Sequence, residues 1–278
     1  MQIEMLPNEL SSFRQTFPSG YQQGGIKLKV KMTSYESQDF YLLKRYNDIA
    51  MLKLGKNFLS NAIDLAIENP LLDVFDHIAE NDEIKVLVIM NCPEKIGREE
   101  YIDFFRQVIA NEFERRSIHR MCNIFNQLIL KLVGLNKLVI HTDCGEVIPL
   151  FLNMSLACDY RIVATHTIFQ KPYFELGFLP KGGGAFFLCK MLGNSKTRQL
   201  LESEEDINAI EALELGIVDQ VVPNKELEKT AIQLALRLAN RPTRSLAGIK
   251  RLINYSMRDL EDYLSFENQE IIKIIGTF

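Results

Sequence analysis

The segment Ile84–Met90, with the sequence IKVLVIM, is apolar on both of the faces that a β-strand would present. Such a run predicts a strand that is covered on both sides, which is typical of parallel sheets. Before it, apolar residues recur at helical spacing from Asn61 to Ala79, with Pro70 placed to kink or restart the helix. Residues 26–54 are predicted to form β structure, because IKLKVKM and DIAMLKL alternate between apolar and polar, with FYLL between them and a turn at Asn47-Asp48. Strand, helix and doubly buried strand together predict a βαβ unit.

The rest of the chain alternates between short apolar strands and longer helical segments. Strands are predicted at Leu138–Thr142, Tyr160–Ala164 and Val218–Val222, with an extended segment at Ile168–Phe174 around Pro172. Helices are predicted at Tyr101–Arg115, Ser117–Val133, Ala185–Leu192, Asp206–Leu215, Lys225–Asn240, Thr243–Ile253 and from Met257 onward. We expect one main α/β domain with a helical C-terminal part, preceded by an irregular stretch over residues 1–25.

The composition is that of a globular chain with a mildly acidic balance. Its 278 residues contain 32 Lys and Arg against 36 Asp and Glu, so the formal net charge is −4. Because no basic stripe is present to release phosphate counterions, we expect no nucleic-acid partner. We expect no membrane partner either, because no apolar run approaches the roughly 20 residues of a membrane span. The N-terminus does not resemble a secretory signal, and five scattered cysteines favour free thiols in a reducing cytoplasm.

Several catalytic and metal-binding signatures are missing from the sequence, among them the Walker, GxGxxG, HExxH and GxSxG motifs. The pairs His119/Cys122 and His141/Cys144 have a spacing that suits a metal, but two ligands do not make a zinc site. We therefore expect no metal. Gly182–Gly184 either cradles an anion at the N-terminus of the helix that follows or forms a tight turn.

Three segments of the second half carry a family resemblance. They are ACDYRI (Ala157–Ile162), ELGFLPKGGG (Glu175–Gly184) and the block A-x-E-A-L-x-x-G-I-V-x-x-V-V-P that ends at Pro223. In this order and spacing, the chain resembles the crotonase (enoyl-CoA hydratase/isomerase) superfamily over roughly residues 48–266. The resemblance implies an α/β fold of the crotonase type, which is a spiral of ββα units with a helical C-terminal trimerisation region.

The resemblance also implies a division of the chain and a mode of assembly. Residues 1–47 would form an N-terminal extension with a β-hairpin, residues 48–223 the spiral core and residues 224–278 the helical oligomerisation region. The implied assembly is a trimer or a dimer of trimers. The implied ligand or substrate is acyl-CoA or another acyl thioester, with no cofactor besides the thioester itself.

Chemistry in this family uses two backbone N–H groups as an oxyanion hole and one or two carboxylates as proton carriers. Aligned by the motifs, the oxyanion donors fall near Glu99 and Leu150, and three carboxylate positions hold Asn153, Tyr173 and Lys181. Asn does not exchange protons near neutral pH, and the unperturbed pKa of Tyr or Lys is about 10. Standard hydration is therefore not expected of this chain.

The remaining catalytic candidates lie close to these positions. In an extended segment, Tyr173 and Glu175 would point to one side, Tyr173 as a donor to an enolate and Glu175 as a relocated base. The alternatives are a packed aromatic ring and a structural carboxylate. Arg98 and Lys181 are candidates for contacts to CoA phosphates. A Cys144 thiol nucleophile is disfavoured, because strand alternation puts it opposite His141.

Two functions are compatible with this sequence. The first is an enzyme on acyl-CoA or another acyl thioester that carries out isomerisation, decarboxylation or hydrolysis in place of hydration. The second is a homologue without catalytic activity that serves as a binding or scaffold subunit. The intact Gly182–Gly184 turn does not separate the two, because packing alone would preserve it.

Overall fold

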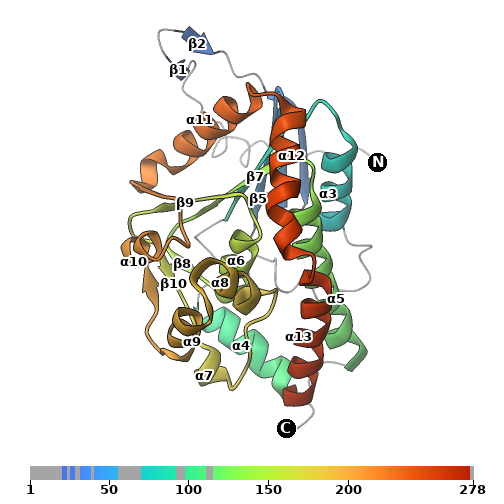
Figure 1. Cartoon of the computed structure of the whole chain (residues 1–278), viewed down its shortest axis with the longest axis vertical. Helices are drawn as coiled ribbons and strands as arrows, with labels where there is room; N and C mark the ends of the chain where they lie inside the picture. Colours follow the sequence, from blue (N-terminus) through green and yellow to red (C-terminus); the bar gives the residue numbers. More distant parts are fainter. Residues whose placement is uncertain are drawn as a thin grey trace, which may run out of the picture.

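The computed structural model describes residues 21–23, 26–28, 32–38, 41–55, 70–91, 98–110 and 115–275, which are drawn in colour in Figure 1. Its main sheet has seven strands in the order β12-β9-β7-β6-β5-β4-β3. These strands are β3 (Met32–Gln38), β4 (Tyr41–Tyr46), β5 (Ile49–Leu54), β6 (Val86–Met90), β7 (Leu138–Asp143), β9 (Tyr160–Ala164) and β12 (Gln220–Val222). Neighbouring strands from β5 to β12 are parallel, and β3 and β4 join antiparallel. The predicted parallel sheet is confirmed.

Two separate hydrophobic cores cover the two faces of the parallel strands. Leu52, Ile89 and Val139 belong to the core that contains the helices α3 (Pro70–Glu80), α5 (Arg115–Gly134) and α6 (Pro149–Leu156). Their neighbours in sequence point the other way and pack against α11 (Leu227–Ala239). All residues of β6 and β7 are buried, which explains why the sequence of β6 is apolar at consecutive positions.

A second, smaller sheet consists of β8 (Glu146–Val147), β10 (Ile168–Phe169) and β11 (Ile207–Asn208). The chain runs from β7 of the main sheet to β8 and then into α6. It repeats this path from β9 to β10 and then into α7 (Tyr173–Leu176) and α8 (Gly184–Leu192). Two successive turns of the chain are therefore ββα units, as the predicted spiral requires.

The C-terminal part is helical and lies along one side of the molecule (Figure 1). It contains α12 (Thr243–Asn254) and α13 (Leu260–Ile275), which follow α9 (Asn194–Glu202), α10 (Ala209–Glu214) and α11 in sequence. The Lys250 ammonium of α12 donates to the carbonyl oxygens of Leu132 and Lys137 at 3.2 and 3.0 Å, and to the Asp159 carboxylate at 2.9 Å. Helix α12 is thereby fastened to the C-terminus of α5, where the helix dipole favours a cation.

Some local predictions differ from the structure. The segment predicted to be extended over Ile168–Phe174 is a strand only to Phe169, and helix α7 begins at Tyr173. Strand β1 (Tyr21–Gln23) pairs with β2 (Ile26–Leu28), although irregular structure was predicted up to residue 25. Strand β3 lies within the β structure predicted over residues 26–54, but helix α9 was not predicted, because it lacks the apolar periodicity of a buried element.

Other local predictions are confirmed. The turn at Asn47 joins β4 to β5, and its φ of 53° is in the left-handed region that Asn tolerates better than most residues. Pro70 is the first residue of α3, and residues 61–69 of the predicted helix lie outside the described residues. Within the described part of the chain, no helix has both the length and the apolar character required to cross a membrane.

Candidate functional site

Helix α6 is buried along its whole length, and its N-terminus carries one of the predicted oxyanion donors. Ile148 is extended and Pro149 occupies the first helical position, where its lack of an N–H costs nothing. The N–H of Leu150 lies in the first turn, where helix geometry supplies no partner four residues earlier. Glu99 likewise lies in the first turn of α4 (Arg98–Ile109). Both predicted donors therefore lie at the positive ends of helix dipoles.

Two of the expected carboxylate positions form a buried pair. Asn153 of α6 is 1% exposed and donates from Nδ2 to the carbonyl oxygen of Lys181 at 2.8 Å. Its side chain is also a hydrogen-bond partner of the Tyr173 hydroxyl. Burial raises the pKa of Tyr173 well above its ordinary value, an effect that this hydrogen bond only partly offsets. At neutral pH the phenol is therefore a proton-bearing donor and not a base.

A second buried tyrosine stands beside this pair. Tyr101, in the first turn of α4, is 2% exposed, and burial raises the pKa of its hydroxyl well above 10, with a further contribution from Tyr173. The sequence did not single out Tyr101, because one aromatic residue on an amphipathic helix is indistinguishable from ordinary core. The site is therefore lined by neutral hydroxyl and amide groups.

The predicted partnership between Tyr173 and Glu175 is wrong in its geometry. The prediction required an extended segment, but both residues lie in the single turn of α7, so their side chains diverge. Tyr173 is buried, whereas Glu175 is exposed and forms ion pairs with Arg98 at 2.8 Å and Arg106 at 3.5 Å. Glu175 is therefore a surface carboxylate already neutralised by cations. It does not lie beside Tyr173, which its predicted role as a base required.

The two residues predicted to contact CoA phosphates already have anionic partners within the chain. Arg98 pairs with Glu175 and with Asp206 at 3.4 Å. Lys181 is 3% exposed and pairs with Glu267 of α13 at 2.9 Å. A phosphate at Arg98 would have to compete with two carboxylates, and the ammonium of Lys181 faces the interior.

Glu267 is a functional-site candidate that the sequence argument missed. Its Oε1 accepts from Gly182 N–H at 2.7 Å and its Oε2 accepts from Gly183 N–H at 2.9 Å. Both glycines have positive φ, 95° and 78°, which aims successive N–H groups at one anion. Both alternatives for Gly182–Gly184, an anion cradle and a tight turn, are therefore realised, and the anion comes from the chain itself. The sequence feature that could have identified Glu267 is its position, as a glutamate, within the apolar stripe of α13.

The His141 side chain is also buried, but its partner is Asp143 and not Cys144. His141 Nδ1 lies 3.0 Å from Asp143 Oδ2, and Asn91 Nδ2 donates to the other oxygen of Asp143 at 2.8 Å. Cys144 belongs to the core on the α11 side of the sheet, whereas His141 alternates to the other face with Val139. The arrangement contains no thiol activated by the imidazole, which agrees with the disfavoured status of that hypothesis.

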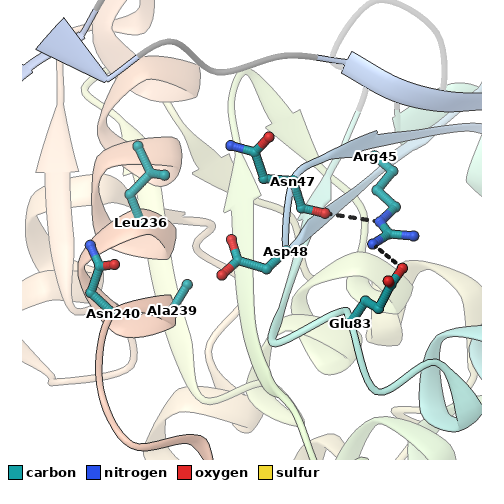
Figure 2. Close-up of a pocket in the computed structure, with 7 residues that line it drawn as sticks. All are labelled: Arg45, Asn47, Asp48, Glu83, Leu236, Ala239 and Asn240. Atoms are coloured by element: carbon teal, nitrogen blue, oxygen red, sulfur yellow. Dashed lines mark hydrogen bonds and ion pairs between the residues drawn. The ribbon is translucent and has the colours of Figure 1, made fainter.

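A surface pocket of about 400 Å³ lies elsewhere, between the β4–β5 turn and the end of α11 (Figure 2). Its walls are formed by Arg45, Asn47, Asp48, Glu83, Leu236, Ala239 and Asn240. Figure 2 shows the Arg45 guanidinium turned toward the Asn47 carbonyl and the Glu83 carboxylate, and both hydrogen bonds occupy it. Because this pocket is on the α11 side of the sheet, it is distinct from the Asn153–Tyr173 site.

The Enoyl-CoA hydratase/isomerase family profile matches residues 44–275, which is most of the chain. The chain therefore belongs to that family, and the predicted crotonase-type fold is confirmed. A crystal structure of an enoyl-CoA hydratase from Bacillus halodurans has the same fold, with a TM-score of 0.74 at 19% identity over 85% of this chain and 95% of that one. An enoyl-CoA hydratase structure from Geobacillus kaustophilus gives 0.71 at 25% identity, with 86% and 90% covered.

Curated relatives cover most of the chain at low identity. A trans-2-decenoyl-[acyl-carrier-protein] isomerase of Streptococcus mutans is 28% identical over 74% of this chain and 78% of its own length. A short-chain-enoyl-CoA hydratase of Clostridium acetobutylicum is 26% identical, with 85% and 89% covered. The two relatives are named for different reactions on acyl thioesters.

The buried Lys181–Glu267 pair makes a prediction about stability. We expect Glu267→Gln to lower the free energy of unfolding by about 3–5 kcal/mol, because it leaves the Lys181 ammonium buried without a counter-charge. The double variant Lys181→Met/Glu267→Leu should recover most of that loss, because it removes both buried charges. Urea unfolding followed by circular dichroism measures all three proteins. A double variant that is less stable than Glu267→Gln would show that the unpaired buried ammonium is not the cause of the loss.

Proposed function

We propose that this chain binds acyl thioesters, carried on coenzyme A or on acyl carrier protein, and that it stabilises enolates without adding water. Family membership supports an acyl-thioester ligand. The names of the Streptococcus mutans and Clostridium acetobutylicum relatives support both carriers and both an isomerase and a hydratase chemistry for the family. Hydration is disfavoured by this chain's own residues.

The observation that carries the proposal is the Asn153–Tyr173 pair. Water addition needs a group that accepts a proton from water and a group that returns one to the substrate. Asn153 does neither, and its amide is engaged by the Lys181 carbonyl and the Tyr173 hydroxyl. The raised pKa of Tyr173 keeps its proton in place at neutral pH. The pair therefore lacks a base that could activate water.

The same groups suit an enolate. Backbone N–H groups near Leu150 and Glu99 are the proposed donors to the thioester oxygen, and the phenol of Tyr173 is the proposed further donor. In a decarboxylation, the electrons of the breaking C–C bond move to the thioester oxygen, CO₂ leaves and Cα of the enolate then takes a proton supplied by solvent, so no base is needed. Isomerisation needs a proton acceptor as well. Of these two reactions, decarboxylation therefore requires fewer proton-transfer groups from the protein.

A catalytically inactive binding or scaffold subunit is the second candidate. The observation in its favour is that the charged groups around the site are neutralised within the chain. Lys181 is paired with Glu267, and Arg98 with Glu175 and Asp206. A site of this kind can bind a neutral acyl group through packing and backbone donors while transferring no proton.

The proposal predicts no measurable hydration of crotonyl-CoA, because the loss of each general acid or base typically costs about 10²–10⁴-fold. Hydration is followed by the loss of enoyl-thioester absorbance, and calorimetry measures binding of the same compound. Turnover near the enzyme median of about 10 s⁻¹ would refute the assignment.

In a panel of 3-enoyl and 2-carboxyacyl thioesters, Tyr173→Phe should slow any observed reaction at least about tenfold, or 1.4 kcal/mol. Tyr255→Phe, an exposed matched control, should not. Binding without turnover across the panel would favour the scaffold subunit.

The oxyanion assignment is tested by a substitution that removes one backbone N–H. Leu150 is in the first turn of α6, so Leu150→Pro deletes the donor without removing a helical hydrogen bond, and α6 begins one residue later because the residue before a proline disfavours the helical conformation. We expect a loss of about 10²–10³-fold in kcat for any thioester that is turned over, or a comparable weakening of an enolate-mimicking ligand. Leu150→Ala truncates the same side chain but keeps the N–H, and it controls for packing. Equal effects of the two variants would exclude Leu150 as the donor.

We also propose self-assembly as a trimer or dimer of trimers through α12. The side chains of Ile249, Leu252 and Ile253 are 53%, 79% and 61% exposed, a contiguous apolar row on one helix. Leu252→Glu should convert the assembly to monomers in light scattering at micromolar concentration. Arg244→Glu, an exposed charge change near the N-terminus of α12 and outside the apolar row, should leave it intact. A wild-type monomer under these conditions would refute the proposed assembly.

A further inference from the structure

Helix α13 places one charged side chain in the middle of an apolar face. Its other buried residues are Leu260, Leu264, Ile271 and Ile275, and Glu267 is 5% exposed among them. A buried carboxylate is costly unless hydrogen bonds and an opposite charge compensate for its lost hydration. The segment Lys181–Gly183 supplies all of this compensation, and it belongs to a different part of the chain, more than 80 residues earlier.

The compensating groups form a complete carboxylate-binding site. Gly182 and Gly183 present their N–H groups to different oxygens of the carboxylate, at 2.7 and 2.9 Å. The Lys181 ammonium adds the opposite charge at 2.9 Å, and the Asn126 amide oxygen accepts a second hydrogen bond from it. Two convergent N–H groups and a fixed cation recognise the carboxylate group and not the rest of a glutamate. The Lys181–Gly183 segment is therefore a carboxylate receptor that is occupied by a side chain of the same chain, Glu267.

This receptor adjoins the Asn153–Tyr173 site. A Cβ placed on Gly184 would lie 2.4 Å from Asn153 Oδ1, and one placed on Gly182 would lie 3.8 Å from Asn153 Cβ. The glycine segment is therefore packed directly against Asn153, which in turn binds the Tyr173 hydroxyl. Glu267 also raises the pKa of Tyr173, so its charge is felt at that hydroxyl. Asn153 therefore contacts both the receptor and the Tyr173 hydroxyl.

We infer that the Lys181–Gly183 segment is a receptor for a carboxylate at the distal end of an acyl group, and that Glu267 fills it in the absence of such a ligand. The ligand class is a dicarboxylic acid bound as a thioester at one end and ionised at the other. The acyl-thioester half of this inference rests on the proposed function, whereas the carboxylate half rests on the contacts of Glu267 alone.

The carboxylate half is tested without any thioester. Glu267→Ala vacates the receptor, and about 100 mM propionate should raise its midpoint of thermal unfolding by at least about 3 °C relative to equal chloride. Glu267→Gln is the matched control, because its amide still fills the space, and propionate should not stabilise it. If Glu267→Ala fails to fold, refolding is scored with and without propionate, and rescue by propionate alone supports the receptor. No stabilisation and no rescue would overturn it.

The acyl half is tested by calorimetry with succinyl-CoA and butyryl-CoA, which differ in the terminal carboxylate. Glu267→Ala, in propionate-free buffer, should bind succinyl-CoA at least about tenfold more tightly than butyryl-CoA, which is 1.4 kcal/mol. The wild type, whose receptor is filled, should bind succinyl-CoA about tenfold more weakly than the variant does. Equal affinities of the variant for both thioesters would overturn the ligand assignment. Propionate rescue without binding of either thioester would refute the proposed function and leave the carboxylate receptor standing.

Discussion

The Glu267 carboxylate and the Lys181 ammonium lie 2.9 Å apart, and both side chains are almost completely shielded from water. This ion pair joins α13 to the glycine segment that precedes α8. That segment packs directly against Asn153. Because leaving one partner of such a pair unpaired is strongly destabilising, the positions of α13, the glycine segment and Asn153 depend on one another. The C-terminal helix is in this sense part of the site.

The chemistry proposed for the site follows from the burial of its polar groups and the pairing of its charges. Asn153 and Tyr173 form a hydrogen bond with each other in a buried environment, and burial favours the neutral phenol. The carboxylates near the site are held by cations, Glu175 by Arg98 on the surface and Glu267 by Lys181 inside. Neutral donors that point at a thioester oxygen stabilise negative charge there, but they do not remove a proton from water. In the proposed function, the loss of hydration and the retention of enolate stabilisation therefore have one physical cause.

Much of the fold was predictable because burial leaves a periodic trace in the sequence. Strand β9 was predicted at its observed bounds, and β6, β7 and α12 to within two residues, because each is either apolar throughout or apolar on one face. The bounds of strand β3 were not predicted within the β structure expected over residues 26–54, because its sequence MTSYESQ has no such trace and its place in the sheet is set by pairing with β4. The short helix α7 was missed for a related reason. Four residues beyond a proline carry too little periodicity to separate an extended segment from one helical turn.

The sequence by itself determined the family and the parallel sheet, because motifs and apolar runs are local properties, and it predicts that Asn153, Tyr173 and Lys181 replace three expected carboxylates. Only the tertiary structure decided that Tyr173 is buried while Glu175 turns to the surface, since that depends on whether two adjacent steps are extended or helical. Only the tertiary structure brought Glu267 to Lys181, across 86 residues of chain. Which helix face meets which turn is set by packing of the whole core, and no local pattern records it.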